Sequence, residues 1–511
     1  MHLLRSTATV GGLTMISRVT GFVRDMLIAT VLGAGPVSDA FFVAFKLPNF
    51  FRRITAEGSL SVAFIPVFTG LLAGEGPAAA RRFLEDVTAV VLAVLIAASA
   101  AAIIAMPQVL TVLAPGFVAT PSRFELAVEL CRITFVYLPL ISAMALLAGA
   151  LNGMQRFAAV ACAPILLNLI LIGAMALFAD RLETPAHVLS WAVMISGVAQ
   201  LTWVAVAAGR HGMIPRLRRP SWTPGLARLF RLMVPAMLGA AVIQINLVID
   251  VVLASLLAEG SISFLYYADR VTQLPLGVVG VAIGTVLLPT LSAQMRQGEV
   301  DAANRSRNDL LLLGMLLTLP AAGGLAILAA PVIGVLFERG AFAATETAQT
   351  AAAMAAYAVG LPAFVAVKVL QPVFFAREDT RTPVTVAAIA VGLNLVLNLI
   401  LMQFFAHVGL AMATSIAAWF NAGVLTWLLQ REGIYGVSPR TWGRIARLLA
   451  ATLVMGVVLV LADRSLPPSP GPWLEAAQLA ALIGGGALVY AAAVLLFGGV
   501  RLGELRGYLA R

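Results

Sequence analysis

Long apolar runs dominate the chain, and most of them match the thickness of a lipid bilayer. A helix rises 1.5 Å per residue, so about 20 apolar residues cross a hydrocarbon core of about 30 Å. The runs, with the glycine, proline and charged residues that break them, predict fourteen transmembrane helices. Their expected ranges are 8–34, 38–72, 86–108, 126–151, 157–179, 186–209, 229–257, 262–294, 307–334, 345–375, 382–405, 408–430, 442–462 and 474–498.

Composition favours an all-α polytopic membrane protein. Of the 511 residues, 61% are hydrophobic and 11% are charged, which excludes a soluble multidomain protein. The first apolar run contains Arg18 and Arg24 and lacks a cleavage pattern, so we expect a retained helix. Cys131 and Cys162 lie in apolar runs, and the four histidines are scattered. We therefore expect no disulfide, metal site or cofactor.

The basic residues predict the orientation of the chain in the membrane. If both ends are cytoplasmic, the inside loops and helix ends carry 22 of the 34 lysines and arginines, and eight lie within helices. The outside loops then carry only Arg123, Arg181, Arg339 and Arg464. The positive-inside rule therefore places both termini in the cytoplasm. This distribution also explains the net charge of +10 without a nucleic-acid-binding patch.

The two halves of the chain look like copies of one unit. Asp25 and its apolar neighbours resemble the sequence around Asp250, and Leu-Asn-Leu-Ile-Leu occurs at both 167–171 and 397–401. The offsets, 225 and 230, are each consistent with a duplicated six-helix unit in parallel orientation. The predicted organisation is an N-terminal lobe at 1–210, a cytoplasmic linker at 211–228, a C-terminal lobe at 229–431, and two further helices with a cytoplasmic tail at 432–511.

The first two predicted helices contain an unusual number of charges. These are Arg18, Arg24, Asp25, Asp39, Lys46, Arg52, Arg53 and Glu57. Each charge facing the bilayer centre would cost about 2.5 to 3.5 kcal/mol, so the charges must line water, face one another or bind an anion. Internal ion pairs, such as Arg24 with Asp39, are one interpretation. Five positive against three negative charges leave an excess, however, and a cationic cavity within the membrane is typical of an anion transporter.

Polar motifs inside the first two predicted helices and inside the predicted helix 262–294 resemble a known family. They are Ser17-Arg18-Val19-Thr20-Gly21-Phe22-Val23-Arg24-Asp25, Ser38-Asp39-Ala40-Phe41, Lys46-Leu47-Pro48-Asn49-Phe50-Phe51-Arg52-Arg53 and Ala268-Asp269-Arg270. The chain resembles, over essentially its whole length, the MurJ (MviN) family of lipid II flippases in the multidrug/oligosaccharidyl-lipid/polysaccharide exporter superfamily. The resemblance implies two six-helix lobes around a cationic cavity, alternating access, and a groove for the polyprenyl tail on predicted helices 13 and 14.

The resemblance also implies which residues bind substrate and ions. The diphosphate is assigned to four arginines, since guanidinium binds phosphate in a bidentate manner. With their polar neighbours, the predicted substrate-binding residues are Arg18, Arg24, Arg52, Arg270, Ser17, Asp39, Asp25, Lys46 and Asn49. A sodium site of the family falls on Asp250, Asn394, Asn398 and Thr414. Some relatives have a carboxylate at the position of Asn398, so sodium coupling, proton coupling and simple helix-to-helix hydrogen bonds all stay open.

The predicted function is movement of lipid II, the undecaprenyl-diphosphate-linked peptidoglycan precursor, from the cytoplasmic to the periplasmic leaflet of a bacterial inner membrane. The alternatives are a flippase for another polyprenyl-linked glycan and a cation-coupled exporter. An enzyme acting on such a lipid should show a catalytic carboxylate pair or a water-facing histidine, and none stands out. A scaffold without transport would not explain charges inside helices. Expected partners are lipid II, membrane lipids and the cell-wall synthesis machinery; sodium coupling, proton coupling and the membrane potential stay open as the energy source.

Overall fold

The structure is a computed structural model that describes residues 2–53, 60–179, 181–216, 218–297, 299–433, 436–467 and 471–500. Within these residues every regular element is a helix and no strand occurs, which confirms the predicted all-α class. Nine helical stretches of the described residues are long and apolar enough to cross a membrane. The number fourteen therefore stays a prediction, and Glu57 lies outside the described residues.

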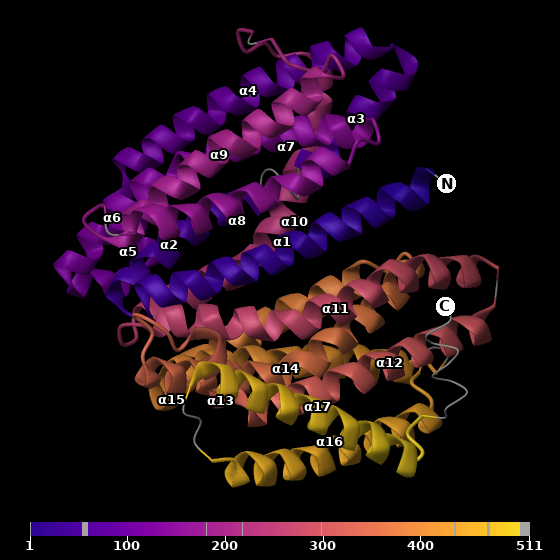
Figure 1. Ribbon diagram of the computed structural model, residues 1–511. Helices are drawn as coiled ribbons and strands as arrows, with labels where there is room; N and C mark the ends of the chain where they lie inside the picture. Colours follow the sequence, from indigo (N-terminus) through magenta and orange to yellow (C-terminus); the bar gives the residue numbers. More distant parts are fainter. Residues whose placement is uncertain are drawn as a thin grey trace. The chain divides into compact units, whose positions relative to one another are not determined.

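The helices overlap the predicted apolar runs, but the predicted single helices 86–108, 126–151 and 307–334 each fall on two helices of the structure (Figure 1). In the first half they are α1 His2–Leu32, α2 Pro36–Arg52, α3 Ser61–Gly74, α4 Pro77–Ile104, α5 Met106–Leu113, a 3₁₀ turn Pro115–Ala119, α6 Pro121–Phe135, α7 Tyr137–Gly153, α8 Ala158–Phe178 and α9 Pro185–Gly209. In the second half they are α10 Pro224–Ser255, α11 Ser261–Arg296, α12 Val300–Ile327, α13 Ala329–Phe337, α14 Ala344–Ala376, α15 Arg381–Arg431, α16 Pro439–Ser465 and α17 Pro472–Leu496.

Proline marks the start of many helices. Its fixed φ suits the first helical position, where the missing N–H has no intrahelical partner to lose. Helices α2, α4, α6, α9, α10, α16 and α17 all begin this way, at Pro36, Pro77, Pro121, Pro185, Pro224, Pro439 and Pro472. The predicted starts lie one to three residues after the observed ones for α2, α9, α16 and α17, five residues after for α6 and α10, and nine residues after for α4.

Helix α15 contains the two predicted helices 382–405 and 408–430. They are separated by Ala406, whose φ of 47° and ψ of −130° are not helical. The turn depends on a glycine close by, because a Cβ on Gly409 would lie 2.4 Å from the carbonyl oxygen of Leu401. The predicted break between these helices is confirmed.

The chain divides into two compact units. One unit contains Met1–Ser263 and the short segment Arg339–Phe342, and the other contains Phe264–Glu338 and Ala343–Arg511. The boundary between these units falls within α11, and the predicted lobes at 1–210 and 229–431 stay predictions. Helix α10 groups with the first unit, and α16 and α17 group with the second. The six-helix duplication itself stays a prediction.

Aromatic residues of α3 form much of the core of the first unit. The rings of Phe64 and Phe68 stack at 5.3 Å, and Phe64 stacks on Phe83 of α4 at 5.5 Å. Helix α7 presents glycines to these rings, since a Cβ on Gly149 or Gly153 would lie 3.0 Å from a phenylalanine carbon. Small residues allow such close helix contact where lipid supplies little hydrophobic driving force.

In the second unit, α16 packs against α12 and α17, and α16 and α17 lie side by side (Figure 1). Gly456 of α16 approaches Ile327, and Gly486 of α17 approaches Leu459; a Cβ on either glycine would lie 2.9 Å from that side chain. The outer face of these two helices is apolar and open: Leu461 is 64% exposed and Leu488 is 74% exposed. An exposed apolar face of this kind is suited to lipid.

Candidate functional site

Helix α1 carries a buried ion pair between neighbouring residues. Arg24 is 3% exposed and Asp25 is 1% exposed. The guanidinium of Arg24 donates to one carboxylate oxygen of Asp25 through Nε at 3.0 Å and Nη2 at 2.6 Å. Buried charges need such partners, because an isolated charge loses its hydration without compensation. Internal ion pairs were the alternative interpretation of these charges, and Arg24 and Asp39 are both in such pairs. Arg24 pairs with Asp25 and Asp39 with Arg123, rather than with each other as in the example given above.

Asn168 of α8 completes the surroundings of Arg24. Its amide oxygen accepts from Nη1 of Arg24 at 2.9 Å, and its amide nitrogen donates to the carbonyl oxygen of Ser17 at 3.0 Å. The same nitrogen lies 3.1 Å from the hydroxyl of Thr20. Gly21 permits this approach, since a Cβ there would lie 3.3 Å from the Asn168 amide nitrogen. One asparagine therefore joins α8 to α1 and orients the arginine.

A series of contacts leads from Arg24 into α2. The guanidinium carbon of Arg24 lies 5.4 Å from the centre of the Phe45 ring, within the range of a cation–π interaction. Asn49 donates to the carbonyl oxygen of Phe45 at 2.8 Å and accepts from Nε of Arg52 at 3.1 Å. Since Asn49 and Arg52 are three residues apart on one helix, they share a face. The structure thus links four predicted site residues: Arg24, Asp25, Asn49 and Arg52.

Asp39 lies in a separate buried cluster. It is fully buried, and its carboxylate accepts from Nη2 of Arg123 at 2.6 Å. It also accepts from the backbone N–H of Gly260 at 2.7 Å, and from the N–H and hydroxyl of Ser263 at 2.9 and 2.6 Å. The last three donors belong to the start of α11, where backbone N–H groups lack helical partners. Asp39 therefore caps α11 and pairs with α6 in the structure described.

The remaining predicted residues of α1 and α2 differ in exposure. Arg18 is exposed, whereas Ser17 and Lys46 are half-buried. Arg18 and Asp25 lie seven residues apart on α1, and the structure places Arg18 at the surface and Asp25 in the interior. Taken together, α1 and α2 carry Arg18, Arg24, Lys46 and Arg52 in their membrane-length portions.

Arg270 belongs to α11 in the second unit. Its guanidinium carbon lies 5.5 Å from the centre of the Tyr266 ring, and the side chain is half-buried. Gln273 donates to the neighbouring carboxylate of Asp269, one helical turn away. This part of α11 is therefore amphipathic within an apolar helix. The joint role of Arg270 with the arginines of α1 and α2 is a proposal made below.

The predicted ion-coupling residues are only partly brought together. The amide nitrogen of Asn398 donates to the amide oxygen of Asn394 at 3.0 Å, and both side chains are buried. Thr414, beyond the turn at Ala406, lies 3.5 Å from the amide nitrogen of Asn394. These contacts confirm that Thr414 faces the asparagines. Asp250 lies on α10, in the other compact unit, so its participation stays a prediction.

A cavity of about 360 Å³ lies elsewhere in the first unit. It opens among the N-terminal part of α1, the α7–α8 turn and the end of α9, and its charged side chains include Arg156 and Arg210. None of the predicted substrate-binding residues lines it. It is therefore distinct from the charged residues of α1 and α2.

Two residues that contact the buried charges, Arg123 beside Asp39 and Asn168 beside Arg24, were not identified as site residues from the sequence. Arg123 was assigned to an outside loop, because the count of loop charges does not show that its side chain turns inward. Asn168 was noted only as part of the repeated Leu-Asn-Leu-Ile-Leu. A signal for it did exist, since a polar side chain inside a long apolar run needs a hydrogen-bonding partner.

Comparison with protein families and curated proteins gives a consistent result. A family model described as lipid II flippase MurJ matches residues 28–471. A Rhizobium tropici protein named probable lipid II flippase MurJ is 41% identical over 520 residues, with 100% of this chain and 97% of the relative covered. A Burkholderia cenocepacia protein named lipid II flippase MurJ is 35% identical over 463 residues, with 89% of each chain covered.

Comparison with solved structures points to the same fold. A structure of lipid II flippase MurJ in an inward closed conformation matches with a TM-score of 0.80 and 25% identity, covering 96% of this chain and 98% of that one. An inward-facing multidrug resistance MATE family transporter of the MOP superfamily matches with a TM-score of 0.68 and 15% identity, covering 84% of this chain and 98% of that one. The second likeness concerns the fold alone.

Proposed function

Because the chain belongs to the MurJ family of lipid II flippases, we propose that it moves lipid II from the cytoplasmic to the periplasmic leaflet of a bacterial inner membrane. The family is one of transporters, not of enzymes. The nine apolar helical stretches found among the described residues suit a multi-pass membrane protein. By the positive-inside rule, both termini lie in the cytoplasm.

The observation that carries this proposal is the guanidinium of Arg24, buried inside a membrane-length helix and continued through Phe45 and Asn49 to Arg52. A helix that only anchored the protein would gain nothing from these groups, since each charge is costly in lipid. A diphosphate accepts bidentate hydrogen bonds from guanidinium. Arg18 and Arg270 are proposed to complete the binding site.

The proposed transport cycle is alternating access. The phosphorylated headgroup enters from the cytoplasm, binds the arginines, and leaves on the other side after a change of conformation. The prenyl chain stays in lipid throughout, because each of its carbon units would lose favourable apolar contact in water. We assign the tail to a groove on α16 and α17, whose outer faces carry exposed leucines. In this proposal, polar groups inside the apolar helices bind the headgroup, and the exposed apolar surface of α16 and α17 contacts the prenyl tail.

Reconstitution tests this function directly. Vesicles that contain only the purified protein and fluorescent lipid II should expose inner-leaflet headgroups to an external quencher faster than protein-free vesicles do. A second arm carries labelled undecaprenyl phosphate without sugar and peptide, and a third applies a membrane potential. A rate equal to that of protein-free vesicles, with and without the potential, would contradict the flippase assignment.

For ion coupling, we propose that Asp250 carries the exchangeable charge and that Asn394, Asn398 and Thr414 have a supporting role. Their oxygens could ligate a sodium ion, but they are uncharged, so the site depends on Asp250 for negative charge. Asp250 as a proton carrier is the alternative form of this coupling. The contacts that support the proposal are the bonds that Asn394 forms with Asn398 at 3.0 Å and with Thr414 at 3.5 Å.

Replacement of these residues by alanine should separate the two roles. We expect Asp250→Ala to reduce the transport rate by about tenfold or more, since it removes the only charge of the set. Asn398→Ala should reduce it only about twofold, since one neutral hydrogen bond is worth about 1 kcal/mol or less in a membrane. The vesicle assay at several sodium concentrations and pH values measures both. If Asp250→Ala and Asn398→Ala reduced the transport rate equally, and the reduction depended on sodium concentration, a sodium site that uses all four residues would be favoured instead.

A further inference from the structure

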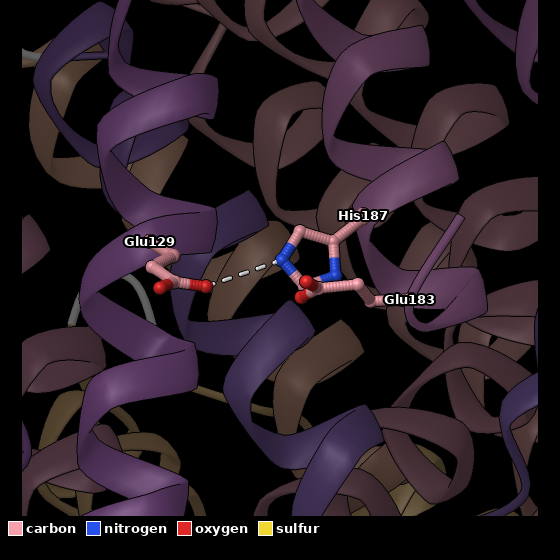
Figure 2. Close-up of side chains that lie close together, drawn as sticks. All are labelled: Glu129, Glu183 and His187. Carbon is pink, nitrogen blue, oxygen red and sulfur yellow. Dashed lines mark hydrogen bonds and ion pairs between the residues drawn. The ribbon is translucent and has the colours of Figure 1, made fainter.

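A polar cluster lies where α6 meets the start of α9, within the first unit. It consists of Glu129 of α6, Glu183 just before α9, and His187 in the first turn of α9. Their potential ligand atoms all lie within 4.8 Å of one another. Figure 2 shows both carboxylates beside the imidazole ring. We propose that these three side chains bind a divalent transition-metal ion, with Zn²⁺ as the best match, and that the ion connects α6 to α9.

The spacing of two of these groups already suits a metal ion. Nε2 of His187 lies 3.3 Å from Oε2 of Glu129. In tetrahedral zinc sites the ion lies about 2.0 to 2.2 Å from nitrogen or oxygen ligands, which puts neighbouring ligand atoms about 3.4 Å apart. Glu183 is exposed and can reach the same point by rotating its side chain. Binding therefore needs side-chain adjustment and no rearrangement of the helices.

The orientation of the imidazole ring is fixed from its other side. The hydroxyl of Thr184 lies 2.9 Å from Nδ1 of His187, and Thr184 is the residue that precedes α9. When Nδ1–H donates to this hydroxyl, the lone pair of Nε2 points toward Glu129. Metal-binding histidines are usually held by such a second hydrogen bond. In the other tautomer Nε2–H donates to Glu129, so metal binding has to shift this hydrogen to Nδ1.

Exposure favours a site that an ion can enter. The side chain of His187 is 12% exposed, so the ring is held firmly, whereas the side chain of Glu129 is 57% exposed. Water can therefore reach the carboxylates and occupy a fourth ligand position. The two carboxylates together match the charge of a divalent ion. The site is assembled by folding, because Glu129 and His187 are 58 residues apart in sequence.

The donor set selects among ions. One imidazole nitrogen and two carboxylate oxygens suit Zn²⁺ and other late first-row ions. Mg²⁺ and Ca²⁺ prefer oxygen ligands alone, and Mg²⁺ demands octahedral geometry. We therefore expect the site to retain zinc in the presence of an excess of magnesium.

The experiment measures zinc binding to the full-length protein in detergent. Protein stripped with a chelator is dialysed against Zn²⁺ with excess Mg²⁺, and bound metal is measured by mass spectrometry. We expect about one zinc ion per chain for this site. The variants His187→Ala, Glu129→Gln and Glu183→Gln should each raise the dissociation constant about tenfold or more. Zinc should also raise the thermal unfolding midpoint of the unaltered protein and not that of His187→Ala.

Matched controls separate this site from general zinc binding. Glu125→Gln changes an exposed carboxylate one turn away on the same helix, and His211→Ala changes an exposed histidine outside the cluster. Both should bind zinc as the unaltered protein does. Each variant is checked for an unchanged circular dichroism spectrum and elution volume without metal. Zinc binding that survives His187→Ala or Glu183→Gln in a folded protein would overturn the three-ligand site.

Discussion

Arg24→Ala is expected to reduce lipid II transport about 100-fold or more. The guanidinium is 3% exposed, hydrogen-bonded to Asp25 and Asn168, and close to the Phe45 ring, so its position is fixed, and we propose that it binds the diphosphate from there. Removing one preorganised donor from an anion-binding site typically costs about 10²- to 10³-fold. Arg24→Lys should be intermediate, because it keeps the charge but loses the bidentate geometry. Initial rates of lipid II translocation in vesicles measure these effects.

Two further variants determine whether Arg24 binds substrate or only holds helices together. Asn168→Ala removes the contact between α8 and Arg24 without removing the guanidinium, so a substrate-binding role predicts a much smaller loss of transport. Arg132→Ala removes an exposed arginine of α6 that donates to the carbonyl oxygen of Ile103, and it should transport normally. If Asn168→Ala lost transport as fully as Arg24→Ala, helix packing would explain the effect of both.

The positions of the helices were predictable because their causes are local. An apolar run of sufficient length, a proline at its first turn and a turn residue after its end lie next to one another in sequence. The break at Ala406 is an example, since the residues around it interrupt the apolar pattern at the same place. The whole-chain resemblance added the family, because polar motifs within apolar helices are specific.

The pairing of the buried charges was not predictable in the same way. Arg123 is 84 residues from Asp39, and Asn168 is 144 residues from Arg24. No local pattern encodes which helices become neighbours or which way a side chain turns, so the sequence could offer Arg24 with Asp39 only as an example of an internal ion pair. The cluster of Glu129, Glu183 and His187 was missed for the same reason.

The second large effect is expected at Asp39. Asp39→Asn should destabilise the protein by about 3 to 5 kcal/mol, because it leaves Arg123 as a buried charge without its ion-pair partner. The amide also offers one acceptor oxygen, whereas the carboxylate accepts from Gly260 and Ser263 with both of its oxygens. The thermal unfolding midpoint of the purified protein should fall sharply. Ser263→Ala should have a milder effect, since the backbone N–H still donates.

A double-mutant cycle tests the cause of this effect. Asp39→Asn with Arg123→Met removes both buried charges, so the pair should be more stable than Asp39→Asn alone. Recovery is expected to be partial, because the N–H groups at the start of α11 still lack the carboxylate. If the double variant were less stable than either single variant, burial of an unpaired arginine could not be the source of the loss.

The same cycle decides between the two roles of Asp39. The resemblance assigns it to the substrate, whereas its partners in the structure are Arg123 and the start of α11. If its role is to hold α2, α6 and the start of α11 together, transport should follow stability across the single and double variants. If Asp39 acts on the headgroup, the stabilised double variant should stay as inactive as Asp39→Asn. Transport rates of the single and double variants, measured at one temperature and compared with their unfolding midpoints, separate these outcomes.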